Sequence, residues 1–112
     1  MRLKRIKALT IKRSEWARGK RTETNRLLDG AGMRCCLGFW CSAAGVSDDD
    51  LLGQMDPEDV ATVPLLVEGG YNSNLASHAI QINDDVDIAD RTREAKLREL
   101  FATKGVKVRF VP

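Results

Sequence analysis

The sequence predicts an α+β fold: a small sheet that includes the N- and C-terminal strands, packed on a buried central helix and a C-terminal helix. Three observations support it. No charged residue occurs within 35–47, so a helix over 35–44 would have no polar face and would be buried on all sides. Residues 92–103 have an apolar stripe with helical spacing. Apolar and basic residues alternate over 3–13 and 106–110, and these amphipathic strands are expected to pair.

Length and composition agree with a single domain over residues 1–112. Of these residues, 43% are hydrophobic and 30% are charged, which is an ordinary globular balance. No stretch approaches the about 18 apolar residues of a membrane span. Charges interrupt the N-terminal segment too often for the apolar core of a signal peptide. We therefore expect a soluble protein in the cytoplasm, without contact to a membrane.

The N-terminal strand has one irregularity in its pattern. Ile6 and Ala8 share one alternating phase, and Leu9 and Ile11 share the other. This change of phase predicts a bulge near Ala8. Residues 14–25 are polar and are expected to form a loop or a short helical turn.

Short signals predict where the next elements begin and end. Residues 27–28 are expected to form a short strand before a glycine-rich turn. Gly38 lowers the helix propensity of the central helix, which indicates a close backbone contact at that position. Gly45 fits the residue that follows the end of this helix.

Acidic residues gather in the segment 47–59, which holds six of them. Ser47 can cap a short helix whose first turn is Asp48–Asp50, and Asp56 followed by Pro57 repeats this logic. Helix capping therefore accounts for most of these acids. The alternative is an acidic surface that imitates nucleic acid and occupies the basic groove of another protein.

The later part of the chain is predicted from weaker patterns. Residues 63–67 form an apolar segment, residues 71–74 a polar loop, residues 75–80 a helix in preference to a strand, and residues 83–85 a turn. The stripe of the C-terminal helix is formed by Ala95, Leu97, Leu100 and Phe101. One core cluster is expected to contain Leu37, Phe39, Trp40, Leu97, Leu100, Phe101, Val108 and Phe110.

Charge is segregated along the chain although the net charge is only +2. Residues 1–34 carry a net +8, residues 35–90 a net −11 with no Lys or Arg, and residues 91–112 a net +5. Such blocks can draw one polyanionic partner to one face of the molecule. Alternatively, the blocks meet in space and neutralise each other.

Several short motifs follow one another in a recognisable order. They are Trp16-Ala17-Arg18-Gly19, Leu27-Leu28, Cys35-Cys36-Leu37-Gly38, Ile82-Asn83-Asp84, the helix containing Arg93-Glu94, and the final strand Gly105–Val111. This order resembles a group of small phage and prophage proteins of unknown function. The resemblance implies a phage accessory protein that counters host defence or diverts a host factor, and it supplies no catalytic or binding residue.

A cysteine hydrolase is one candidate chemistry. Cys36 near a helix start, His78 as base and Asn83 or Asp84 as the orienting group would form a papain-like arrangement. The alternative is that the cysteines are inert core residues. Neighbouring cysteines on one buried helix are a poor start for a zinc site, so no metal and no cofactor are predicted.

An anion-binding loop is the other candidate. Trp16, Arg18, Lys20 and Arg21 combine cations that can hold phosphate with a ring that can stack on a base. The alternative is that Trp16 anchors this loop to the core. No motif for sequence-specific nucleic-acid recognition is present. The sequence thus favours a non-enzymatic protein that binds a host protein or a phosphate-bearing ligand such as a nucleotide, and it leaves self-association open.

Overall fold

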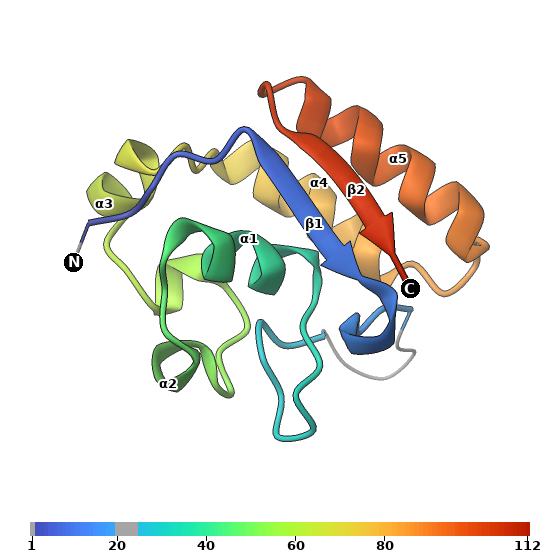
Figure 1. Ribbon diagram of the computed structural model, residues 1–112, viewed down its shortest axis with the longest axis horizontal. Coiled ribbons are helices and arrows are strands. Elements are labelled where there is room, and N and C mark those ends of the chain that lie inside the picture. Colours follow the sequence, from blue (N-terminus) through green and yellow to red (C-terminus); the bar gives the residue numbers. More distant parts are fainter. Residues whose placement is uncertain (1, 20–24) are drawn as a thin grey trace.

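The computed structural model describes residues 2–19 and 25–112. Their elements, in chain order, are β1 (Ala8–Lys12), the 3-10 turn η1 (Arg13–Glu15), α1 (Cys36–Ala44), α2 (Asp48–Leu51), η2 (Pro57–Asp59), α3 (Val63–Glu68), α4 (Ser73–Asp84), α5 (Asp90–Ala102) and β2 (Lys107–Val111). A small sheet packs against helices, which confirms the predicted α+β class. Figure 1 shows β1 and β2 side by side, with α5 running along β2 and α1 beneath β1.

The two terminal strands pair, as predicted, and they are parallel. Their register places Leu9 beside Val108 and Ile11 beside Phe110, and all four side chains are buried. Their neighbours in each strand are exposed or partly exposed, so the sheet has one apolar and one polar face. The predicted bulge near Ala8 is wrong. The strand begins at Ala8, and the other phase of the pattern lies before it.

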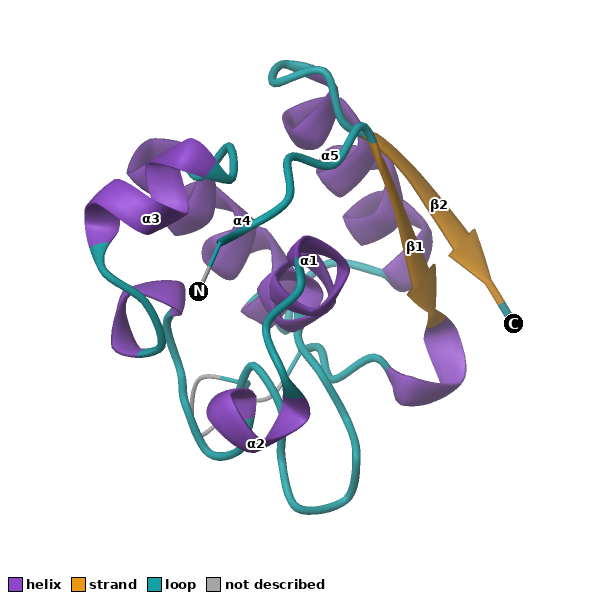
Figure 2. Ribbon diagram, turned by 60° about the vertical axis from the view of Figure 1, so that its left-hand side comes forward, coloured by secondary structure: helices purple, strands orange, loops and turns teal. Residues whose placement is uncertain are grey.

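Helix α1 lies at the centre of the molecule, which Figure 2 shows nearly end-on. Its buried residues include Cys36, Leu37 and Trp40. Gly38 makes the close contact that its position predicts, because a Cβ atom there would lie 1.9 Å from the carbonyl oxygen of Leu27. Gly45 ends the helix with φ at +108°, a conformation that favours glycine.

Local capping signals predict several helix starts correctly. The side chain of Ser47 accepts a hydrogen bond from the backbone N–H of Asp50, and that of Asp56 accepts one from Glu58. The acids of α2 and η2 are thus placed at helix starts, where the helix dipole favours them.

Three predictions for the middle of the chain are wrong. Residues 83–84 belong to α4 and not to a turn, and the loop expected over 71–74 ends early because α4 begins at Ser73. The strand predicted at 27–28 is reduced to an isolated bridge between Leu28 and Leu52.

Helix α5 buries a different set of residues from the one its apolar pattern predicts. Leu97 and Phe101 are buried and Leu100 is half-buried, but Ala95 is exposed. Arg93 and Glu94 are buried in its place. Of the predicted core residues, Leu37, Trp40, Leu97, Phe101, Val108 and Phe110 are buried in one cluster, and Phe39 and Leu100 pack against it.

Candidate functional site

Trp16 is a core residue in the structure. Only 1% of its surface is exposed, and its ring packs on Phe110 with 5.0 Å between ring centroids. Its indole N–H donates a hydrogen bond of 2.8 Å to Oδ1 of Asn83. The prediction that Trp16 stacks on a ligand is therefore corrected, because both its ring and its polar group are already occupied.

The side chain of Arg18 is bound by residues that surround Trp16. Its guanidinium lies 4.4 Å from the centre of the Trp16 ring and donates to a carboxylate oxygen of Asp90 at 3.0 Å. It also donates to the carbonyl oxygens of Arg13 and Trp16. Lys20 and Arg21, the other predicted binding residues, lie outside the described residues.

Asn83 joins three separate segments of the chain. Its side chain is fully buried, and Oδ1 accepts from the backbone N–H of Cys36 as well as from Trp16. Its amide group donates to the carbonyl oxygen of Ala17 and to Asp84. Every polar atom of this side chain is paired, so Asn83 ties the N-terminal loop, α1 and α4 together.

Arg93 closes the C-terminal end of α4. One nitrogen of its buried guanidinium donates to the carbonyl oxygens of Ile82, Asn83 and Asp85, and another donates to Ile88. Carbonyl groups at a helix end have no partner within the helix, and this side chain supplies one. These bonds explain why α4 continues through Asp84.

The cysteine hydrolase arrangement is not supported. Cys36 is fully buried, and its thiol donates to the carbonyl oxygen of Ala79 at 3.7 Å. Burial raises the pKa of this thiol well above its ordinary value, which disfavours the nucleophilic thiolate. His78 is exposed on the surface of α4, and Asn83 bonds to the backbone of Cys36 instead of orienting a histidine.

The environments of the other two thiols also disfavour the thiolate. Burial raises the pKa of Cys35 to about 11 and that of Cys41 to about 12. All three cysteines are free and buried, as predicted for residues of an apolar helix. Across residues 2–19 and 25–112, no three His, Cys, Asp or Glu side chains converge as a metal site would require.

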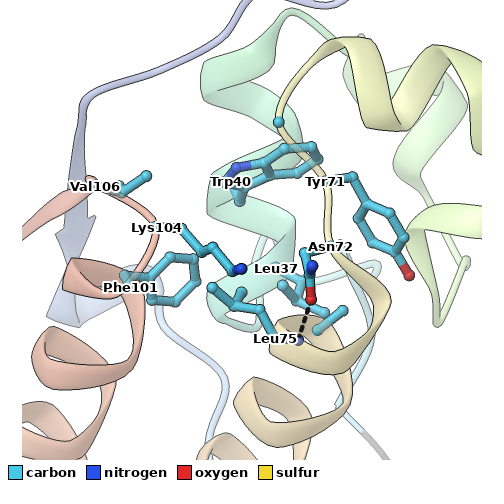
Figure 3. Close-up of a pocket in the computed structure, with 10 residues that line it drawn as sticks. Leu37, Trp40, Tyr71, Asn72, Leu75, Phe101, Lys104 and Val106 are labelled. Atoms are coloured by element: carbon cyan, nitrogen blue, oxygen red, sulfur yellow. Dashed lines mark hydrogen bonds between the residues drawn. The ribbon is translucent and has the colours of Figure 1, made fainter.

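A different concave site lies between the N-terminal segment, the loop before α4 and the turn between α5 and β2. We call it the Trp40 hollow, and its lining includes Arg5, Lys7, Trp40, Gly70, Lys104 and Val106. Its volume is about 300 Å³, and a notch of about 20 Å³ adjoins it beneath Trp40 and Lys104. Figure 3 shows the lining of this notch.

The floor of the Trp40 hollow is apolar and its rim is cationic. Trp40 is only 5% exposed, so it forms a floor and offers no open stacking face. In Figure 3 the side chain of Lys104 reaches over the notch toward Leu37 and Leu75. The hydroxyl of Tyr71 points away and donates to a carboxylate oxygen of Glu58 at 2.8 Å.

The three cations of the rim differ in how they are held. The Arg5 guanidinium donates to the carbonyl oxygens of Val67 and Glu68, which fixes it at the end of α3. Lys7 and Lys104 are exposed and form no ion pair with the described part of the chain. None of the described residues that line the hollow or its notch is acidic.

Sequence patterns indicate neither Lys7 nor Lys104 as members of a site. Both belong to the basic terminal blocks, but nothing local distinguishes them from the other cations there. Trp40 is correctly predicted as core, and its position under a hollow depends on segments remote in the chain. Only the fold brings these three residues together.

Comparisons with known proteins add nothing to this geometry. No protein-family model matches the chain, and no curated protein or solved structure matches it. In the described ranges, no helix combines the length and the hydropathy that crossing a bilayer would demand.

Proposed function

We propose that this chain is a non-enzymatic binding protein and that the Trp40 hollow receives the phosphate group of a phosphate-bearing ligand such as a nucleotide. The observation that carries the proposal is the charge of the hollow. Arg5, Lys7 and Lys104 surround a concave apolar floor, and the described residues that line it include no carboxylate.

Unpaired cations around a concave site attract anions more strongly than cations on a convex surface, because apolar walls exclude water and reduce screening. Phosphate carries up to two negative charges and several acceptor oxygens, so it can contact more than one rim cation at once. Arg5 is already positioned by its two bonds to carbonyl oxygens. Lys7 and Lys104 can turn toward the ligand.

The size of the hollow is consistent with a small ligand. Ligand pockets start at about 300 Å³, and the Trp40 hollow reaches about that volume. The notch of about 20 Å³ has room for a group the size of one water molecule. A mononucleotide would place its phosphate at the rim and an apolar edge over Trp40.

The proposal is for binding and not for catalysis. The nucleophile–base pair considered in the sequence analysis, Cys36 with His78, does not converge on an accessible cleft. The motif order described above further suggests a phage-type accessory protein that acts in the cytoplasm of a bacterial host, in host takeover or anti-defence. A host protein is the second candidate partner.

Calorimetric titration tests the proposed ligand class. We expect AMP, ADP or inorganic phosphate to bind, adenosine to bind at least about tenfold more weakly than AMP, and binding to weaken between about 50 and about 300 mM salt. Lys104→Ala should weaken AMP binding about tenfold. Lys96→Ala is the matched control, since Lys96 is an exposed lysine of α5 outside the hollow. Equal binding of adenosine and AMP, or equal effects of the two variants, would contradict the proposal.

A further inference from the structure

One edge of strand β2 pairs with no strand of the described part of the chain. The N–H of Lys107 donates to the carbonyl oxygen of Lys7, and in a parallel ladder with this register Lys107 and Arg109 direct their backbone groups toward β1. The backbone groups of Val108 and Phe110 then point to the opposite side. Within the described ranges, no backbone hydrogen bond is made to either residue from that side. In Figure 2, β2 is the outermost element on its side of the sheet.

A groove follows this edge between β2 and α5. Its volume is about 380 Å³, and it is lined by Arg98, Ala102, Gly105, Val106, Lys107 and Val108. The lining is mainly apolar, with cations at its rim. An added strand would therefore find backbone partners on one side and an apolar surface for alternate side chains below it.

The two faces of such an added strand would meet different surroundings. On the exposed face of the sheet, Lys107 and Arg109 would be its neighbours, and Lys12 lies on the same face of β1. On the other face lie Ala102 and Val108. Opposite charges on neighbouring strands stabilise a sheet, so acidic residues suit the exposed face and apolar residues suit the groove.

Arg98 adds to the positive charge at the rim of the groove. Its side chain is 48% exposed, and its contact with Glu94 is long at 3.5 Å. Glu94 is bound more closely by Arg13, through two hydrogen bonds of 2.8 Å each. Arg98 is consequently available to a carboxylate of a partner.

We propose that the β2 edge binds an extended segment of a partner protein in which acidic and apolar residues alternate, by addition of a third strand. A second copy of this chain is disfavoured as the occupant. Pairing β2 with β2 would bring Lys107 and Arg109 of two copies together, and like charges on adjacent strands repel. The proposal does not depend on a ligand in the Trp40 hollow.

The first test uses three peptides and the unaltered protein. The probe is a capped heptapeptide of alternating Glu and Val. Its controls are the same peptide with Lys in place of Glu, and the acidic peptide N-methylated at alternate residues, which cannot form the ladder. Amide hydrogen exchange is followed by NMR. With the acidic probe, protection at Val108 and Phe110 should rise at least about tenfold, and neither control should produce this change.

Several results would overturn the proposal. Equal binding of the acidic and the basic peptide would remove the charge argument, and equal binding of the methylated peptide would remove strand addition. Absence of binding at about millimolar peptide would also contradict it. If Val108 and Phe110 are protected in the free protein and protection rises with protein concentration, the edge pairs with a second copy instead.

Charge reversal provides the second test. The double variant Arg98→Glu/Lys107→Glu should weaken binding of the acidic probe at least about tenfold. The matched control is Arg91→Glu/Lys96→Glu, which reverses two exposed cations of α5 outside the groove. Similar losses in both variants would show that the attraction is general and not local to the groove.

Discussion

At the scale of single residues, the polar side chains in the interior define the structure around the N-terminal loop. Asn83 and Arg93 are buried, and their polar atoms satisfy the ends of several segments. Sequence patterns suggested that Asn83 orients His78, and they suggested no role for Arg93. The difference is physical: Trp16 lies 67 residues from Asn83, and no local pattern reports such a partner.

Asn83→Ala is expected to lower the free energy of unfolding by about 2–4 kcal/mol. It would leave the indole N–H of Trp16, the N–H of Cys36 and the carbonyl of Ala17 without their partner in a buried site. Urea unfolding measures the loss. Asn74→Ala, an exposed change in the same helix, should alter stability by less than about 0.5 kcal/mol. If Asn83→Ala lowers the free energy of unfolding as little as Asn74→Ala does, the buried network is contradicted.

Gly38→Ala is expected to destabilise strongly although alanine favours helices. The gain in helix propensity is about 1 kcal/mol. The added Cβ would lie 1.9 Å from the carbonyl oxygen of Leu27, so backbone must move. We expect a net loss of about 3 kcal/mol or more, or failure to fold. Gly30→Ala is the control, because a Cβ there meets no atom within 4 Å. A Gly38→Ala protein as stable as this control would exclude the close packing of α1.

At the scale of elements, starts and stops that carry a local capping signal are well predicted, whereas the bounds of α4 and the buried face of α5 are predicted less well. Ser47, Asp56 and Gly45 act through neighbours a few residues away, and the structure confirms all three. The buried face of α5 includes Glu94 because Arg13 pairs with it, and it includes Arg93 because backbone carbonyl groups around the end of α4 accept its hydrogen bonds. Hydrophobic spacing cannot indicate a charged residue whose partner comes from another part of the chain.

Two leucines of α5 test its orientation. Leu97 is fully buried, so Leu97→Ala should cost about 2–5 kcal/mol in a urea melt. The helical spacing alone would predict an equal loss for Leu100→Ala. Because Leu100 is half-buried, we expect this variant to lose only about 1–2 kcal/mol of unfolding free energy. A reversed order of the two losses would mean that α5 presents another face to the core.

At the scale of the whole molecule, the charge blocks of the sequence partly neutralise each other. Three arginines of the N-terminal block pair with acids from later segments: Arg13 with Glu94, Arg18 with Asp90, and Arg34 with Asp48. Several of the other cations lie along the Trp40 hollow and the exposed face of the sheet. The sequence predicts the presence of excess positive charge, but its position follows only from the fold.

The pair of Arg13 and Glu94 makes stability depend on pH on the acid side. Hydrogen bonds from Arg13, opposed by burial, hold the pKa of Glu94 below its ordinary 4.5. Because the folded pKa is the lower one, this stabilisation is present above about pH 4.5 and is lost as pH falls below it. Glu94→Gln should therefore flatten the acid dependence of the urea midpoint, whereas Glu99→Gln, an exposed control, should not. An unchanged slope in Glu94→Gln would assign the acid sensitivity to other groups.

In the candidate site too, features set by neighbouring residues could be predicted, and features set by residues distant in the sequence could not. The α+β class, the pairing of the terminal strands and the burial of the cysteines could be predicted, because each rests on composition or local alternation. The ligand site could not, because Lys7, Trp40 and Lys104 come from three distant segments. Trp16 was misleading for a related reason: a tryptophan in a basic loop looks accessible until Asn83 and Phe110 are placed against it.

The most direct test of the proposed site is an NMR titration of the two indole N–H groups with AMP. We predict that the Trp40 resonance shifts with AMP, because Trp40 forms the floor of the hollow. The Trp16 resonance should stay in place and remain protected from exchange by its bond to Asn83. Lys104→Ala should suppress the Trp40 shift, and Lys96→Ala should leave it unchanged. A shift of Trp16 without one of Trp40 would contradict this account and place the binding surface on the N-terminal loop.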